Sequence, residues 1–409
     1  MADASAHAET PLRPLSTFQQ WMVGLASVAM GAGMSINFVV VAPLARKAGL
    51  AEVEVAGILT LSAAIYALMI PQWGRWADQF GRKRVMVFSL MAMGFTNMAF
   101  LFALEAALAG VITGMTMFFT LVFVRVWFGL LSPGLQPASM AAMTDATTSE
   151  TRAAGLGMLG AAMSIGSILG PAGASVLAPF GALVPLWGSI IFCISCGLLV
   201  GFALPKTRAA RQSAKRPTPL SARDPRVFPH LLFLFCYFVA VGMVQQTLGW
   251  FIEDRYQLGE EQTVLFTGIA FGCLALMMIV VQFGYVQPFN PDPRKMLPAG
   301  LITVAIGYVM ANLFFPFWAL CLAFIIIGIG AALAVPAANA LGSLSVNQNE
   351  QGAAAALLAA APPSGFIVGP LLGASLYQLA APLPLYASAV VMGALSTYAL
   401  LVVARRPLR

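Results

Sequence analysis

Apolar residues run through this chain in long stretches that short polar segments separate. A helix of about 20 apolar residues crosses the roughly 30 Å hydrocarbon core of a bilayer. Because a chain in lipid must satisfy its backbone hydrogen bonds within itself, each stretch predicts a transmembrane helix. We count twelve, with approximate bounds 19–43, 53–73, 84–104, 111–144, 150–178, 184–205, 229–252, 262–287, 296–316, 317–345, 349–378 and 382–404. The pattern predicts an all-α membrane protein with twelve transmembrane helices.

Composition excludes several classes of protein. The chain is 60% hydrophobic and 9% charged, whereas soluble domains carry about 25% charged residues. The five cysteines lie inside predicted spans, and no His, Cys, Asp or Glu group has the spacing of metal ligands. No catalytic or nucleotide-binding motif appears. We therefore expect no enzyme, no metal and no cofactor.

The positive charges predict an orientation. With both termini inside, nearly all Lys and Arg residues fall on the inner side, which is the positive-inside pattern. The net charge of +7 then reflects topology, and nucleic-acid binding is not expected. We expect a multi-pass protein of the bacterial inner (plasma) membrane with cytoplasmic termini, surrounded by the lipid bilayer and working as a monomer.

A polar segment divides the spans into two groups of six. Residues from Pro205 to Pro229 are rich in Arg, Lys, Pro and Ser, which is typical of a flexible linker. The two groups also share a pattern, because five Gly and Pro residues recur 199 positions later. We expect two pseudo-symmetric six-helix halves with the substrate between them. The predicted units are a cytoplasmic tail 1–18, the first half 19–205, a cytoplasmic linker 206–228, the second half 229–404 and a tail 405–409.

One charged segment stands out between the second and third stretches. It reads Gly-Arg-Trp-Ala-Asp-Gln-Phe-Gly-Arg-Lys from Gly74 to Lys83. Gly74 and Gly81 permit close backbone approach and a tight turn, and Asp78 and Arg82 have the i, i+4 spacing of a helical ion pair. The segment resembles the loop between the second and third spans of the major facilitator superfamily, with Trp76 where that pattern has Leu.

The resemblance implies a conformational lock. Asp145 ends the fourth span in a segment that also resembles the family pattern, where this acid joins the loop's Arg and Asp in a network that holds the outward-open state. The resemblance assigns this lock to six residues: Gly74, Asp78, Gly81, Arg82, Lys83 and Asp145. The alternative from the residues alone is a set of solvated loop charges that only fixes topology.

Arg125 lies about halfway along the fourth span, where a charge is costly unless it faces protein or water. Arg125 and Gly129 are similar to the family's Arg-x-x-x-Gly pattern, which implies a central role in proton transfer and in holding the geometry of the halves. A purely structural arginine bonded to carbonyl groups of a neighbouring helix is the alternative.

Small residues form a stripe in the fifth span and again in the eleventh. Glycines four residues apart allow close helix packing, and proline bends a helix. The stripe residues are Gly166, Gly170 and Pro171, with counterparts Gly365, Gly369 and Pro370. The first copy is similar to a motif of the family's exporter branches, chiefly drug:proton antiporters. Packing without any bearing on transport direction is the alternative.

Candidate cavity residues are polar or aromatic groups within apolar spans. The alternative is that each of them forms a hydrogen bond between helices and does not contact the substrate. They are Asn37, Gln136, Gln245, Gln246, Trp250 and Asn339. Many proton-driven antiporters carry an acid inside span 1, and none is present here, so Glu253 and Asp254 at the outer end of span 7 are the proton candidates. The sequence favours proton-coupled export of a small organic molecule such as a drug or a siderophore-like amphiphile. Import or uniport of a neutral or anionic solute is the alternative.

Overall fold

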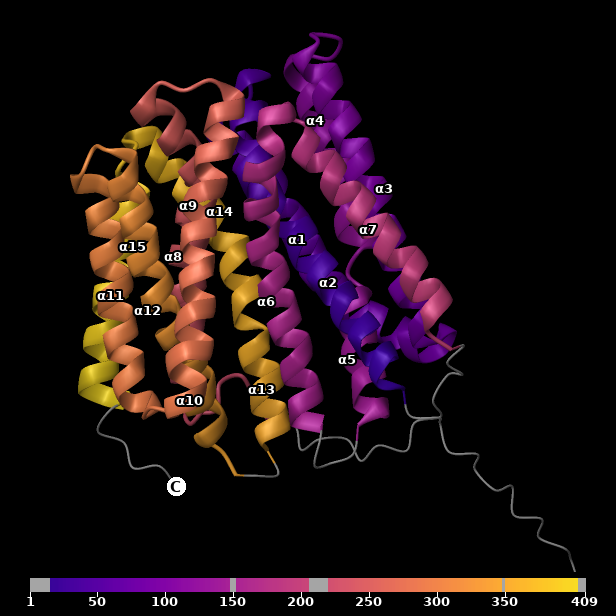
Figure 1. The fold of residues 1–409 in the computed structure, drawn as a ribbon, viewed down its shortest axis with the longest axis vertical. Coiled ribbons are helices and arrows are strands. Elements are labelled where there is room, and N and C mark those ends of the chain that lie inside the picture. Colours follow the sequence, from indigo (N-terminus) through magenta and orange to yellow (C-terminus); the bar gives the residue numbers. More distant parts are fainter. Residues whose placement is uncertain (1–14, 148–151, 206–219, 348–349, 404–409) are drawn as a thin grey trace, which may run out of the picture.

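The computed structural model describes residues 15–147, 152–205, 220–347 and 350–403, and these form helices only (Figure 1). Twelve helices are long and apolar enough to cross a membrane, which confirms the predicted number. The first half holds α1 (Thr17–Lys47), α2 (Glu52–Phe80), α3 (Arg82–Leu108), α4 (Gly114–Leu131), α5 (Leu135–Ala146), α6 (Arg152–Leu177), η1 (Ala178–Phe180) and α7 (Val184–Ala203). The second half holds α8 (Phe228–Tyr256), α9 (Glu260–Val281), η2 (Gln282–Val286), α10 (Gln287–Phe289), α11 (Pro293–Leu313), α12 (Phe317–Leu344), α13 (Gln351–Ala359), α14 (Ala361–Leu379), α15 (Leu383–Tyr398) and η3 (Ala399–Val403).

Several predicted units fall on residues outside the described ranges. These are most of the tail 1–18, residues 206–219 of the linker and the tail 405–409. The division into units therefore stays a prediction. We term the end of the bundle that holds Asp78 and Arg82 the inner end, after the orientation that the charges predict. The opposite end, where α1 and α8 finish, is the outer end.

Two predicted boundaries differ from the structure. The fourth span, 111–144, is interrupted between α4 and α5, because Pro133 lacks an N–H and disfavours helix before it. The predicted eighth span, 262–287, extends slightly further, since η2 and α10 carry the helix to Phe289. The chain turns only at Asn290, whose φ of 40° lies in the left-handed region that Asn tolerates.

The two glycine stripes make equivalent contacts in the two halves. Gly166 and Gly170 of α6 face α1, where an added Cβ would overlap the Val28 carbonyl oxygen or lie 2.7 Å from the Ala32 carbonyl oxygen. Gly369 of α14 faces α8, with the Val239 carbonyl oxygen 2.5 Å from its would-be Cβ. Glycine is needed at these positions because only a hydrogen atom fits against the neighbouring backbone.

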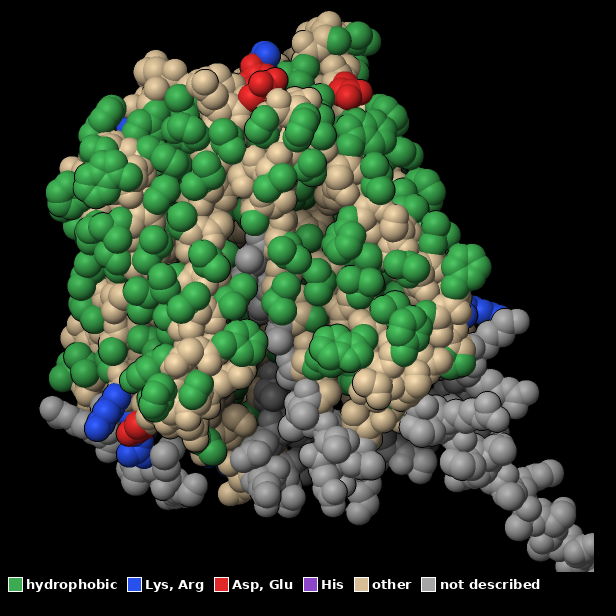
Figure 2. All heavy atoms as spheres, in the orientation of Figure 1, with side chains coloured by type: hydrophobic (Ala, Val, Ile, Leu, Met, Phe, Trp, Pro, Cys, Tyr) green, Lys and Arg blue, Asp and Glu red, His purple; other side chains and the backbone are tan. Residues whose placement is uncertain are grey.

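The side of the bundle is apolar and the charges collect at its two ends. Figure 2 shows hydrophobic side chains over the length of the visible face, with acidic and basic side chains near the top and the bottom. Exposed apolar groups such as Phe123 and Val390 belong to this belt. The distribution is what a lipid-embedded surface requires.

Candidate functional site

Arg82 joins two carboxylates at the inner end of the first half. Its guanidinium lies 3.0 Å from Asp78 at the end of α2, and it also forms an ion pair with Asp145 at the end of α5. The Arg82 side chain is only 10% exposed, while the two acids are 37% and 34% exposed. The sequence brings these three groups together because α2 ends where α3 begins, and α5 packs beside both.

Gly81 makes the abrupt connection between α2 and α3 possible. Its φ of 93° is a conformation that residues with a Cβ rarely adopt, and the Gly81 N–H still donates to the Ala77 carbonyl group. Gly74 is different, because an added Cβ would meet Pro137 at an ordinary 3.7 Å. The expected close approach at Gly74 is therefore absent from this arrangement, whereas the turn at Gly81 is present.

Lys83 anchors the start of α3 to the last helix of its own half. Its ammonium group donates to the Leu204 carbonyl oxygen over 2.5 Å. Together, Asp78, Arg82, Lys83 and Asp145 connect α2, α3, α5 and α7. All four belong to one half, so their mutual contacts do not themselves join the halves, and the lock stays a prediction.

The second half has its own arginine between two acids at the inner end. Arg226, just before α8, bonds Asp224 and reaches Glu350 before α13 over 2.8 Å. These hydrogen bonds hold the pKa of the Glu350 carboxyl below its usual range. Sequence reasoning missed this group, because Glu350 is 124 residues from Arg226 and neither side chain belongs to a motif.

Arg125 lies at the centre of the first half and is only 3% exposed. Its guanidinium donates to the Asn37 side-chain oxygen over 2.6 Å and to the Asn97 side-chain oxygen over 3.4 Å. The guanidinium carbon lies 3.8 Å from the centroid of the Phe100 ring, a cation–π contact. Gly129 allows α4 to pack closely against α2, because an added Cβ there would lie 2.8 Å from the Ser62 carbonyl oxygen.

The polar partners of Arg125 are neutral. No described acid pairs with it, and its Nε atom is buried without a hydrogen-bond partner. The sequence also allowed a structural arginine bonded to backbone carbonyl groups of a neighbouring helix. The structure differs, because the Arg125 guanidinium donates hydrogen bonds to the side-chain oxygens of two Asn residues. A buried cation without a counter-charge is costly.

The remaining cavity candidates are dispersed. Gln246 is fully buried with neither amide atom bonded, whereas Gln136 and Gln245 are partly buried. Asn339 is exposed and donates to the Val335 carbonyl group of its own helix. Trp250 is fully buried and donates to the Ala42 carbonyl oxygen of α1 over 2.8 Å. The structure brings only Asn37 to Arg125, and it places Trp250 between the halves near the outer end.

A cluster of charges ties the two halves at the outer end. Arg46 of α1 lies 2.7 Å from Asp254 and 3.7 Å from Glu253, both of α8, and 3.3 Å from Glu52 of α2. The Tyr377 hydroxyl donates to Asp254 over 2.5 Å.

Two further contacts extend this tie. Lys47 pairs with Glu260 of α9, and Gln378 of α14 bonds Glu52. In the described parts of the chain, the contacts of Arg46, Trp250, Lys47 and Gln378 join the halves toward this end. We term Arg46, Lys47, Glu52, Glu253, Asp254, Glu260 and Tyr377 the outer cluster. Figure 2 shows acidic and basic side chains gathered near the top of the bundle, which is the outer end.

Comparison with known proteins supplies the family context. The model of the Major Facilitator Superfamily matches residues 23–287 and 292–409. Multidrug resistance protein 2 of Bacillus subtilis is 25% identical over 335 residues, which cover 79% of this chain and 80% of the relative. Tetracycline resistance protein, class D, of Salmonella ordonez is 26% identical over 372 residues, covering 86% of each chain.

Two solved structures share the fold. A bacterial homolog of the human lysosomal transporter Spinster, in an inward-facing and occupied conformation, superposes with a TM-score of 0.72 at 13% identity, covering 94% of this chain and 96% of that one. The human organic anion transporter MFSD10 (TETRAN) superposes with a TM-score of 0.62 at 18% identity, covering 94% and 98%.

Proposed function

The chain belongs to the Major Facilitator Superfamily, and from that premise we propose that this membrane transporter exports a small organic molecule in exchange for protons. The relatives named for multidrug and tetracycline resistance support the outward direction. Their bacterial origin supports a place in the plasma membrane. The observation that carries the proposal is the one-sided tie between the halves, because a secondary transporter must close one end while the other is open.

In this proposal the outer cluster is the outer gate. Arg46 has to leave Asp254 and Glu253 before the halves separate at that end. The network around Arg82 keeps the inner end of the first half rigid while the halves rock. The outer end therefore acts as a gate and the inner end of the first half stays rigid. The substrate binds near the middle of the bundle, between the two ends.

Proton coupling needs a titratable group, and the described spans have acids only near their ends. The outer cluster contains four acids against two bases, so adding one proton reduces repulsion within it when the gate closes. Glu253 is the better acceptor, because its buried Oε2 atom has no hydrogen bond and lies 3.7 Å from Arg46, farther than Asp254 does. Asp254 is already bonded by Arg46 and Tyr377.

The test is efflux from proteoliposomes with an imposed pH gradient, using tetracycline and a panel of fluorescent drugs as probes. We expect efflux to accelerate when the receiving side is more acidic. Glu253→Gln should reduce that dependence, whereas Asp254→Asn should change the rate at every gradient because it weakens the gate. Efflux that ignores the gradient would establish uniport instead. Gradient dependence unchanged in Glu253→Gln would move the proton site toward Arg125.

A second candidate is supported by the neutral surroundings of Arg125. A substrate with a carboxylate, sulfonate or phosphate would supply the counter-charge that the described side chains lack. A solved structure of the same fold carries the name of an organic anion transporter. Under this reading the transporter prefers organic anions and zwitterions to cations.

Adding a carboxylate beside Arg125 tests whether a counter-charge is missing. Asn97→Asp should raise the thermal unfolding temperature of the detergent-purified protein, since the new acid pairs with a buried cation. Asn37→Asp should raise it less, because the Asn37 amide also donates to the Gly33 carbonyl group over 2.7 Å and Asp lacks that donor. An unfolding temperature that falls in Asn97→Asp would argue that Arg125 needs no anion.

A further inference from the structure

A groove runs along the membrane-facing side of the second half, between α11 and α15. At its inner end is a pocket of about 670 Å³, and beside it is an apolar hollow of about 420 Å³. Ile302 lines both, so the two are continuous. We term this feature the α11–α15 groove. Its lining from the inner end outward includes Lys295, Ala299, Ile302, Ile306, Val309 and Met310 of α11.

The groove faces lipid and lies away from the other half. Val390 of α15 is 71% exposed, and Ile302 and Ile306 are each 48% exposed. From Lys295 to Met310 the helix rises about 22 Å at 1.5 Å per residue. One leaflet contributes about 15 Å of hydrocarbon, so a groove of this length is long enough for an acyl chain over the full depth of its leaflet.

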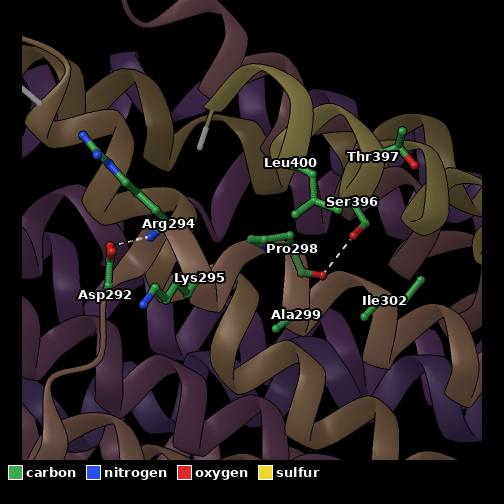
Figure 3. Close-up of a pocket in the computed structure, with 9 residues that line it drawn as sticks. All are labelled: Asp292, Arg294, Lys295, Pro298, Ala299, Ile302, Ser396, Thr397 and Leu400. Carbon is green, nitrogen blue, oxygen red and sulfur yellow. Dashed lines mark hydrogen bonds between the residues drawn. The ribbon is translucent and has the colours of Figure 1, made fainter. Parts of the chain in front are cut away.

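The inner end of the groove is basic. Arg294 and Lys295 lie at one end of the pocket in Figure 3, and Ile302 lies at the other. Neither basic side chain has a described ion-pair partner, and the Arg294 Nε atom is buried without a hydrogen-bond partner. Asp292 is present as well, but its carboxylate caps α11 by accepting from the Arg294 backbone N–H over 2.9 Å. Two bases against one acid leave a net positive charge.

The floor of the pocket is fixed by a bond between the two helices. The buried Ser396 hydroxyl of α15 donates to the Pro298 carbonyl oxygen of α11 over 2.9 Å, as Figure 3 shows. Ala299 lines the same pocket, and a larger side chain at this position would fill part of it. The bond holds α11 and α15 together beside the pocket.

We propose that the α11–α15 groove binds one anionic phospholipid of the inner leaflet. Its phosphate lies against Arg294 and Lys295, and one acyl chain follows Ile302 and Ile306 toward Val390. Charge complementarity selects this occupant, because basic pockets between helices at the cytoplasmic surface attract anionic head groups, and a continuous apolar track needs a chain attached to the head group. The proposal does not depend on the transported substrate.

The experiment is native mass spectrometry of the full-length protein, purified in mild detergent. Dioleoyl phosphatidylglycerol and dioleoyl phosphatidylcholine are added in turn, so that only the head group differs. We expect tighter binding of the anionic lipid. Because one base near the membrane surface changes affinity about fivefold, Arg294→Gln/Lys295→Gln should weaken phosphatidylglycerol binding up to about thirtyfold. Phosphatidylcholine binding should weaken much less, because the choline group offsets the charge of its phosphate.

Matched controls separate this site from general surface charge and general lipid contact. Arg84→Gln/Arg223→Gln removes two exposed bases elsewhere at the inner end and should not change the preference. Ala299→Trp should block the acyl chain and reduce retention of phosphatidylglycerol, whereas Ile191→Trp, at an exposed position on α7, should not.

Three outcomes would overturn the proposal. The first is equal binding of the two lipids by the wild type. The second is equal loss of the phosphatidylglycerol preference in the two double variants. The third is full displacement of the lipid by millimolar glycerol phosphate or inorganic phosphate, which would show that the basic end holds a phosphate without any use of the groove.

Discussion

Replacing Arg82 with alanine is expected to lower transport more than tenfold while leaving the protein folded in the membrane. Arg82 is the only described cation that contacts both Asp78 and Asp145, and its removal leaves two carboxylates near each other without their shared partner. The connection between the α2–α3 turn and α5 then weakens. Asp78→Asn should have the same direction of effect, because the amide cannot replace the charge. Initial rates of efflux in vesicles, normalised to inserted protein, measure both.

Arg84→Ala is the matched control for Arg82→Ala. Arg84 is exposed on the same first turn of α3 and has no described ion-pair partner, so its loss should change the rate by less than about twofold, as for ordinary surface charges. Arg82→Lys should recover only part of the activity, since an ammonium group lacks the fork that reaches two acids. Wild-type rates in Arg82→Ala would reduce the motif to a topological signal.

Replacing Gly166 with leucine is expected to prevent formation of a stable folded protein. A Cβ added to Gly166 would overlap the Val28 backbone. A Cβ added to the facing Gly31 of α1 would likewise overlap the Met163 carbonyl oxygen. Backbone on both sides cannot move as a flexible side chain would, so α1 and α6 must separate. Even Gly166→Ala should lower the unfolding temperature by several degrees, because overpacking of a core costs about 1–3 kcal/mol. Size-exclusion profiles and thermal unfolding report the effect.

Gly173→Leu, on the same helix, is the control for Gly166→Leu. An added Cβ at Gly173 meets nothing within 4 Å, so this variant should fold with nearly wild-type stability. If Gly166→Leu and Gly173→Leu behave alike, the interface between α1 and α6 is looser than the structure indicates.

Local pattern was enough for most of the architecture. Crossing a membrane requires long apolar helices, so hydropathy located all twelve spans, most of them to within a few residues. The Asp78–Arg82 contact was also accessible, because it is an i, i+4 pair. The glycine spacing indicated close packing in α6 and α14, although it did not identify α1 and α8 as the partners.

Contacts between distant segments were not accessible in the same way. The partner of Arg46 could not be predicted, because nothing in the sequence tells which acid it meets 208 residues later. Asn97 was missed as a partner of Arg125, although a lone amide within an apolar span is a signal that could have found it. The neutral partners of Arg125 became evident only when α1, α3 and α4 were seen together.

The glycine contacts described above have a mechanical consequence. The backbones of α1 and α6 are in direct contact, and so are those of α8 and α14. We expect each pair to move as one rigid unit. We therefore expect motion at the outer cluster to be carried along each helix pair to the inner end. Spin labels on the outer ends of α1 and α6 should keep their separation throughout the cycle, while labels on α1 and α8 should move apart when Arg46 releases Asp254.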